Sequence, residues 1–279
     1  MKHFTSSNAI SRQLNKLEQA GQSIGFVPTM GALHEGHMGL IERAKAENNV
    51  VVCSIFVNPL QFNRQVDLDT YPDRMKEDKA MLKSQDCDFL FSPTKEDLYQ
   101  EKPALDYDFG SLGRGMEADY RPGHFEGVAA VIDRFLRVLK PSRAYFGEKD
   151  FQQLAIVKWL VEKENFDTQI VGCETIRFEN GLAMSSRNYN LAEEDFKTAS
   201  EIYQWMKFCQ KNKGQFEPQE LAAFCFEKLK QKFEPEYVTI ADENNMKPLE
   251  KWSDSKRPRV FIAAYLSSVR LIDNLSLIN

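Results

Sequence analysis

Apolar residues in the first 180 positions switch repeatedly between helical and extended spacing. Ile10, Leu14 and Leu17 recur at helical intervals, and Gly21 follows as a stop signal. The run 50–57 (VVVCSIFV) is β-branched and almost wholly apolar, which is typical of a strand covered on both faces. By the same criteria we expect strands at 24–27, 88–91, 144–146 and 169–171, and helices at 37–47, 73–85, 125–139 and 151–162. Alternation of this kind predicts right-handed βαβ units around a parallel sheet.

The pattern changes after about residue 190. Two polar-faced helices are expected at 193–213 and 218–233, followed by short strands at 237–241, 260–264 and 268–271. The sequence therefore predicts an α/β protein: a Rossmann-like, doubly wound, mostly parallel sheet in residues 1–180, and a smaller α+β C-terminal domain in residues 181–279.

Composition narrows the class of protein. The chain is 42% hydrophobic and 28% charged, and its net charge of −5 gives no basic field for a nucleic acid. The chain has 5 cysteines, an odd number, and no Cys-x-x-Cys motif, which favours reduced thiols over disulfides. The N-terminus has no apolar signal-peptide core, and the apolar runs are too short to span a bilayer. We expect a cytoplasmic protein that binds neither nucleic acid nor membrane.

The most informative segment is 28–37 (PTMGALHEGH), which follows the first expected strand. There a glycine-bearing turn and a helix start place His34 and His37 beside free backbone N–H groups, a suitable place to bind phosphates. For an isolated His-x-x-His, a pair of surface turn histidines is the commoner explanation, but here the pair follows a strand, includes Gly31 and Gly36 and opens a helix, which favours the phosphate site. Zinc is a third alternative that no cysteine or H-E-x-x-H pattern supports. The chain lacks G-x-G-x-x-G and the P-loop pattern, which argues against NAD and against γ-phosphate transfer.

Two further motifs follow expected strands and so fall on the same sheet edge. In 56–63 (FVNPLQFN) the amides of Asn58 and Gln61 can bind hydroxyl and carboxylate groups, although a plain Asn-Pro turn explains the segment equally well. In 147–153 (GEKDFQQ) Lys149 can bind phosphate, Asp150 can cap a helix, and Gln153 lies on that helix's first turn.

Two loops complete the candidate chemistry. Segment 184–188 (MSSRN) can clamp a phosphate, although taken alone a surface Ser-Ser turn is favoured. Segment 121–127 (RPGHFEG) follows a glycine-rich stretch typical of a mobile flap, from which Arg121 can reach an anion. His124 fits a helix cap and a ligand contact equally well.

Taken together and in this order, the motifs MGALHEGH, FVNPLQF, RPGHFEGV, AYFGEKDFQQL and GLAMSSRN resemble the pantoate–β-alanine ligase family, one of the HxGH nucleotidyltransferases. The resemblance implies that the carboxylate of pantoate attacks the α-phosphate of ATP, giving pantoyl adenylate and pyrophosphate. The amine of β-alanine then displaces AMP to give pantothenate. It also implies Mg²⁺ with the ATP and a homodimer. An adenylyltransferase that stops at the adenylylated product is the alternative, and a catalytically silent nucleotide-binding protein is a third hypothesis.

The resemblance also implies residue roles. Residues 1–180 would bind nucleotide and pantoate, and residues 181–279 would cover the active site. The implied ATP contacts are Met30, Gly31, Ala32, Leu33, His34, Glu35, Gly36, His37, Gly147, Glu148, Lys149, Asp150, Ile176, Met184, Ser185, Ser186 and Arg187. The implied catalytic residues are His37, His34, Lys149, Ser186 and Arg187, and the implied substrate contacts are Gln61, Gln153, Asn58, Tyr71 and Arg121. No protein ligand for a metal is implied.

Overall fold

A computed structural model describes residues 1–101, 103 and 105–278 of the chain. The chain divides into two compact units. The first comprises Met1–Asp108, Arg121–Glu148 and Gln153–Glu174, and the second comprises Phe109–Tyr120, Lys149–Gln152 and Thr175–Asn279. A single cut after residue 180 therefore does not describe the division, because two short segments of the N-terminal half group with the C-terminal part.

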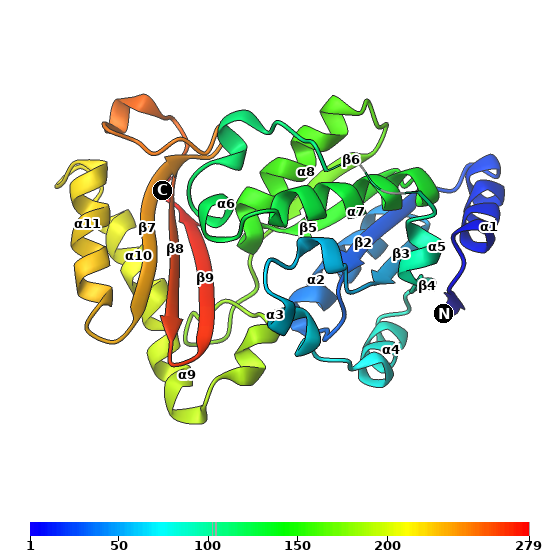
Figure 1. Cartoon of the computed structure of the whole chain (residues 1–279), viewed down its shortest axis with the longest axis horizontal. Helices are drawn as coiled ribbons and strands as arrows, with labels where there is room; N and C mark the ends of the chain where they lie inside the picture. Colours follow the sequence, from blue (N-terminus) through cyan, green and yellow to red (C-terminus); the bar gives the residue numbers. More distant parts are fainter. Residues whose placement is uncertain (102, 104, 279) are drawn as a thin grey trace. The chain divides into compact units, whose positions relative to one another are not determined.

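The first unit is built on a parallel sheet with the strand order β1-β4-β3-β2-β5-β6 over the described residues (Figure 1). Its strands are β1 (Lys2–Phe4), β2 (Ile24–Thr29), β3 (Val50–Ile55), β4 (Phe89–Phe91), β5 (Arg143–Gly147) and β6 (Gln169–Cys173). Its helices are α1 (Ser7–Gln19), α2 (Glu35–Glu47), α3 (Gln65–Asp69), α4 (Met75–Ser84), α5 (Lys95–Leu98), α7 (His124–Leu139) and most of α8 (Phe151–Lys163), with a 3₁₀ turn η1 (Pro59–Gln61).

Helices cover both faces of this sheet, as expected for a doubly wound fold. On one face Val27 and Val51 pack with Ile41 of α2 and Leu82 of α4. On the other face Phe135 of α7 contacts Phe26 and Phe91, with ring centroids 5.4 and 6.0 Å apart. Successive strand residues point to opposite faces, so a strand covered on both sides must be apolar throughout. All six residues of β3 are buried.

The strand order reverses at β2, which pairs with β3 on one side and β5 on the other. In open parallel sheets, ligands bind beyond the carboxyl ends of the strands at such a reversal. Segment 30–34 leaves the end of β2, and Glu148 follows the end of β5. The topology therefore puts the start of two sequence motifs at the position where this fold class binds its ligand.

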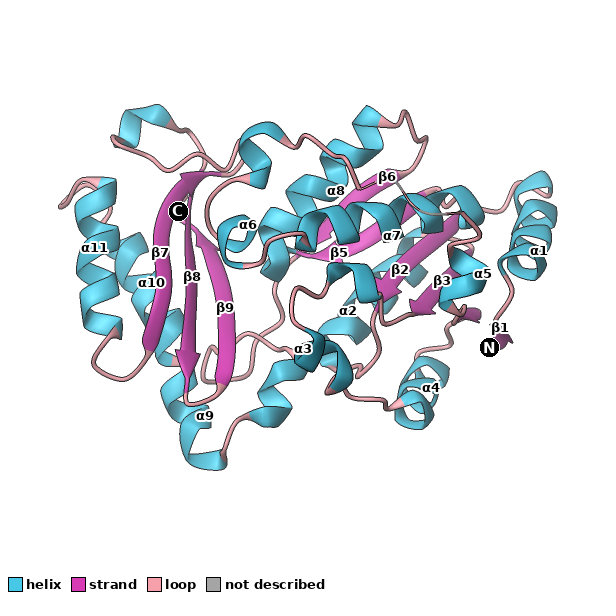
Figure 2. Ribbon diagram, viewed as in Figure 1, coloured by secondary structure: helices cyan, strands magenta, loops and turns pink. Residues whose placement is uncertain are grey.

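The second unit contains an antiparallel sheet in the order β7-β8-β9 (Figure 2). Its strands are β7 (Glu234–Asp242), β8 (Pro258–Leu266) and β9 (Val269–Ser276). Its helices are α6 (Glu117–Tyr120), α9 (Glu193–Ala199), α10 (Glu201–Asn212) and α11 (Pro218–Leu229), with 3₁₀ turns η2 (Gly110–Gly113), η4 (Ser186–Asn190) and η5 (Trp252–Asp254). A further turn, η3 (Glu148–Asp150), leads into α8.

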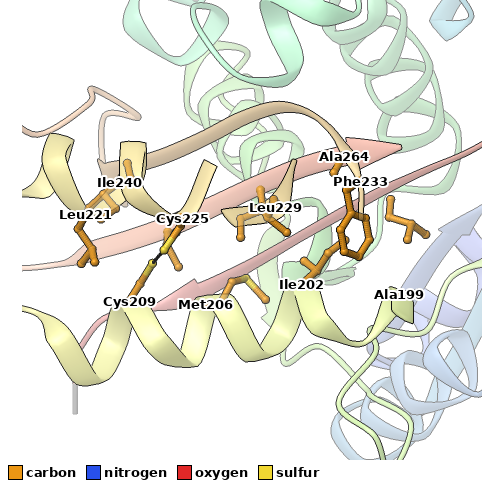
Figure 3. Close-up of a cluster of buried hydrophobic side chains, with 14 of the residues drawn as sticks. Ala199, Ile202, Met206, Cys209, Leu221, Cys225, Leu229, Phe233, Ile240 and Ala264 are labelled. Atoms are coloured by element: carbon orange, nitrogen blue, oxygen red, sulfur yellow. Dashed lines mark hydrogen bonds between the residues drawn. The ribbon is translucent and has the colours of Figure 1, made fainter. Parts of the chain in front are cut away.

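One apolar cluster joins α10 and α11 to this sheet. Figure 3 shows Met206 and Cys209 of α10 facing Leu221 and Cys225 of α11. The sulfur atoms of Cys209 and Cys225 lie 3.3 Å apart, and both are free thiols. Both are fully buried and act as small apolar side chains. In the first unit, burial raises the pKa of the Cys87 thiol to about 11.

The sequence-based fold class is correct, but several helix boundaries differ from those expected. The helix expected at 193–213 breaks at Ser200, whose hydroxyl donates to the carbonyl of Lys197 at 2.7 Å. A serine bonding to its own preceding turn competes with the helical ladder, so α9 ends there. The helix expected at 218–233 ends at Leu229. Within the described residues, no helix combines the length and the apolar character needed to cross a bilayer.

Candidate active site

The turn after β2 carries the histidine motif. Gly31 and Ala32 both adopt left-handed backbone conformations, with φ of +85° and +49°. The turn is held from outside by Asp78 of α4, whose two carboxylate oxygens accept hydrogen bonds from the backbone N–H groups of Ala32 (2.9 Å) and Leu33 (2.8 Å). Glycine is required at position 31, because a Cβ would lie 3.0 Å from Asp78 Oδ2 in a conformation that L side chains rarely adopt.

His34 and His37 cap the helix that they begin. The N–H of Gly36 donates to Nδ1 of His34 at 3.1 Å, and the N–H of His34 donates to Nδ1 of His37 at 3.3 Å. The helix expected to start at residue 37 therefore starts at Glu35, because the imidazoles satisfy backbone donors that would otherwise be orphans. An imidazole that accepts at Nδ1 is neutral and carries its proton on Nε2. Both rings, 4.1 Å apart between centroids, thus carry their proton on Nε2.

The amides of Asn58 and Gln61 lie beside this turn. Asn58 is 1% exposed, and its Nδ2 donates to Gln61 Oε1 at 3.2 Å and to the carbonyl of Gly127 at 2.9 Å. The hydroxyl of Tyr99 donates to Asn58 Oδ1 at 2.9 Å. Gln61 is buried too, and because its oxygen accepts from Asn58, its NH₂ group points the other way and donates to the sulfur of Met30 at 3.0 Å.

Arg121 is tied to the same segment through His124. The guanidinium of Arg121 lies 3.0 Å from His124 Nε2, and His124 Nδ1 lies 2.9 Å from the carbonyl of Gln61. A guanidinium only donates, so Nε2 accepts and Nδ1–H donates to the carbonyl. His124 is 4% exposed, and through these two contacts it links Arg121 to the backbone of Gln61. Tyr71 is half-buried and makes an edge contact with Phe62, while Gln153 is half-buried in the first turn of α8.

Three phosphate-binding candidates of the second unit, Lys149, Ser185 and Arg187, line a small cavity. It has a volume of about 10 Å³, enough for one water, and is lined by Lys149, Ser185, Arg187, Asn188, Arg270 and Asp273, among others. Ser185 caps η4, since its hydroxyl accepts from the N–H of Arg187 at 3.3 Å. The N–H of Met184 donates to the carbonyl of Ile176 at 3.0 Å, so these two candidates share one hairpin. The side chain of Ile176 is 38% exposed.

Asp78 is the main residue that sequence reasoning missed in the first unit. Burial raises the pKa of its carboxyl, an effect that the hydrogen bonds from Leu33 and Ala32 oppose. Its position was detectable in principle, because Asp78 falls on the face of α4 that carries Met75 and Leu82. A carboxylate on an apolar helix face is unusual and indicates a buried partner.

The fold, with a histidine-capped turn at the end of β2, is typical of α/β nucleotide-binding proteins. A family model for pantoate–β-alanine ligase matches residues 2–276. The chain therefore belongs to the pantoate–β-alanine ligase family and is a ligase.

Relatives of the full length agree. A pantothenate synthetase of Cytophaga hutchinsonii is 40% identical over 280 residues, covering 99% of both chains. A pantothenate synthetase of Christiangramia forsetii is 40% identical over 283 residues, covering 100% of both.

Solved structures agree as well. The crystal structure of pantothenate synthetase from Thermus thermophilus superposes with a TM-score of 0.91 at 37% identity, covering 100% of both chains. The pantoate–β-alanine ligase of Francisella tularensis, solved with β,γ-ATP and β-alanine, superposes with a TM-score of 0.83 at 37% identity, covering 99% of this chain and 98% of that one.

Proposed function

We propose that the protein joins pantoate to β-alanine with ATP, giving pantothenate, AMP and pyrophosphate. The observation that carries the proposal is the arrangement around the β2 turn. There two imidazoles that accept at Nδ1 lie on the same turn as Met30, whose sulfur accepts from the NH₂ group of Gln61. Donors for a phosphoryl group thus adjoin an amide suited to a hydroxy acid.

In the first step, a carboxylate oxygen of pantoate bonds to the α-phosphorus of ATP while the bond to pyrophosphate breaks. We assign stabilisation of the charge on the phosphoryl oxygens to His34 and His37. Lys149, Ser186 and Arg187 bind the phosphates that leave. Gln61 and Gln153 hold pantoate, and Asn58, Tyr71 and Arg121 complete its pocket.

In the second step, the amine of β-alanine bonds to the activated acyl carbon, the bond to AMP breaks, and the amine loses a proton. No covalent enzyme nucleophile is required, so positioning and charge stabilisation carry the reaction. The remaining ATP contacts are assigned to two groups. The first is the backbone of the β2 turn and of α2's start, Met30, Gly31, Ala32, Leu33, Glu35 and Gly36. The second is Gly147, Glu148, Asp150, Ile176, Met184 and Ser185.

ATP enters as its magnesium complex. Among the described residues, no three histidine, cysteine or carboxylate side chains are grouped so as to hold a metal ion. We assign Mg²⁺ to the nucleotide, since Mg²⁺ keeps water and phosphate ligands more readily than it enters an all-protein cage.

Location and assembly are proposed from the family resemblance alone. We assign the protein to the cytoplasm and expect a homodimer, without nucleic acid or membrane partners. Light scattering of the purified protein measures the assembly directly, and a monomeric mass at micromolar concentration would refute the dimer.

The function is tested by following AMP and pyrophosphate separately. The ligase releases pyrophosphate when pantoate and ATP are present, and AMP only when β-alanine is added. The alternative adenylyltransferase releases pyrophosphate, but adding β-alanine does not make it release AMP. AMP formed without either acid or amine would refute the proposed function.

A further inference from the structure

Two adjacent residues of β9 interrupt its apolar pattern. Asp273 and Asn274 are 6% and 3% exposed, and they lie in a sheet whose other buried positions include Ile262 and Leu271. Neighbouring residues of a strand point to opposite faces, so these two side chains serve different surroundings. Each makes hydrogen bonds to a segment that carries candidate phosphate ligands.

On one face, Asn274 connects strand β8 to Lys149. Its Nδ2 donates to the main-chain carbonyl of Lys149 at 2.8 Å, and its Oδ1 accepts from Nη1 of Arg259 at 2.6 Å. Arg259 in turn is paired with Glu243 at 2.9 Å and lies over the ring of Phe151, 4.0 Å from its centroid. The residues on either side of Asp150 are thus held by one buried polar chain.

On the other face, Asp273 is bonded to the hairpin that leads into residues 184–188 (MSSRN), the serine loop. Arg177 donates to both oxygens of Asp273, at 2.5 and 3.0 Å, and also to the carbonyl of Gly181 at 3.1 Å. Arg177 and Ala183 form a bridge at the base of this hairpin, directly before Met184. The backbone N–H of Asn274 donates to Asp273 at 2.8 Å, which couples the two faces.

A buried ionic network of this kind does not stabilise the fold more than apolar side chains of the same size would. Replacing buried ion pairs by apolar side chains is often neutral or stabilising, so their presence needs another reason. The position of Lys149 is such a reason. Its ammonium is carried on a flexible four-carbon chain, so the places it can reach depend on the position of the Lys149 backbone. The Lys149 side chain lines the same cavity as Ser185 and Arg187.

We propose that Asn274 is a positioning residue: by donating to the main-chain carbonyl of Lys149, it fixes the position of that lysine. Asp273 and Arg177 fix the position of the serine loop through the carbonyl of Gly181. The proposal rests on the proposed function in one respect, namely that Lys149 binds the phosphates of ATP.

The test uses Asn274→Asp. This change keeps the oxygen that accepts from Arg259 and replaces the NH₂ that donates to Lys149 by an oxygen that repels the carbonyl. We expect binding of a non-hydrolysable ATP analogue, measured by calorimetry, to weaken about tenfold, the scale of one hydrogen bond to a positioned group. Pantoate binding, measured in the same way, is expected to stay unchanged.

A double-variant cycle separates positioning from general damage. In a Lys149→Ala background, where the carbonyl remains but the ammonium is gone, Asn274→Asp should weaken analogue binding by less than about twofold. The matched control is Asn212→Asp, which removes a similar donor to the carbonyl of Phe208 in α10 and should leave analogue binding unchanged. If Asn274→Asp does not fold, Asn274→Ser replaces it in the same cycle.

Three results would overturn the proposal. They are unchanged analogue binding in Asn274→Asp, an equal loss in both backgrounds, and an equal loss in Asn212→Asp. Because the calorimetric readout needs no turnover, failure of this proposal can be told apart from failure of the proposed function, which fails if the unaltered protein forms no AMP from its three substrates.

Discussion

The carboxylate of Asp78 accepts a hydrogen bond from the backbone N–H of Leu33 at 2.8 Å, across 45 residues of sequence. Its second oxygen accepts from Ala32, so Asp78→Asn would turn an NH₂ group against a backbone donor. We expect kcat/KM for ATP to fall about tenfold, because a buried donor left unsatisfied destabilises the turn that offers the imidazoles. Steady-state kinetics with Asp67→Asn as an exposed control measure this. Equal kcat/KM in both variants would show that the carboxylate does not hold the turn.

The same carboxylate makes stability depend on pH. Burial raises the pKa of Asp78 above its ordinary value, so between those two values the folded protein binds more protons than the unfolded chain. This contribution to the free energy of unfolding therefore falls as pH rises through that window. Asp78→Asn removes it, so the stability of the variant relative to the original protein should rise with pH there. Urea unfolding from about pH 4 to pH 7 measures the difference, and a difference that is flat or falls with pH contradicts the expectation.

Local pattern predicted most of the fold because burial on both faces leaves a strong signal. Strand β3 is wholly buried and reads as an apolar run. The break at Ser200 could not be predicted, since a serine is compatible with a helix and only its bond to Lys197 decides the outcome. The placement of segment 109–120 with the C-terminal unit is likewise a tertiary result.

In the candidate site, too, local sequence predicted some residues and tertiary contacts determine the others. The histidine turn was predicted because its residues are contiguous. Asp78 and Asn274 were not predicted as site residues, because each acts on a segment 45 or more positions away through a single hydrogen-bonded side chain. Hydrophobic periodicity carries no information about such pairs.

Which nitrogen of His37 acts can be tested with two amides. Glutamine places its NH₂ near the position of Nε2, whereas asparagine places it near Nδ1. Because Nδ1 of His37 already accepts from the backbone N–H of His34, we expect His37→Gln to keep more activity than His37→Asn. His37→Ala should lower kcat by ~10²–10³, the scale for losing one charge-stabilising donor. The three kcat values are compared at saturating ATP, and the reverse order of the two amides would assign the function to Nδ1.

The orientation of the Gln61 amide depends on Asn58. Asn58→Asp replaces the NH₂ that donates to Gln61 Oε1 by an oxygen, which favours rotation of Gln61 so that its oxygen faces outward. A carboxylate substrate would then meet an acceptor instead of a donor. We expect the KM for pantoate to rise about tenfold with a smaller change in the KM for ATP. Tyr99→Phe, which removes only the hydroxyl that donates to Asn58, should give a weaker effect in the same direction. A rise in both KM values by the same factor would mean that the pocket as a whole had shifted.

Close packing of α7 against η1 makes Gly127 irreplaceable. A Cβ at this position would lie 2.3 Å from the carbonyl oxygen of Leu60 and 2.5 Å from the backbone nitrogen of Gln61. Both are backbone atoms, so the overlap can be relieved only by moving the helix or the turn. Gly127→Ala should therefore lower the free energy of unfolding by about 1–3 kcal/mol, the usual range for overpacking.

Gly147→Ala is the matched control for stability, because nothing lies within 4 Å of a Cβ there. Urea unfolding of both variants measures the difference in free energy. The carbonyl of Gly127 also accepts from Asn58, so a displaced α7 would release the Gln61 amide as well. Gly127→Ala should then raise the KM for pantoate even under conditions where it is fully folded. A variant that is destabilised but binds pantoate normally would show that the turn tolerates movement of the helix, and that the orientation of Gln61 depends on Asn58 and Tyr99 alone.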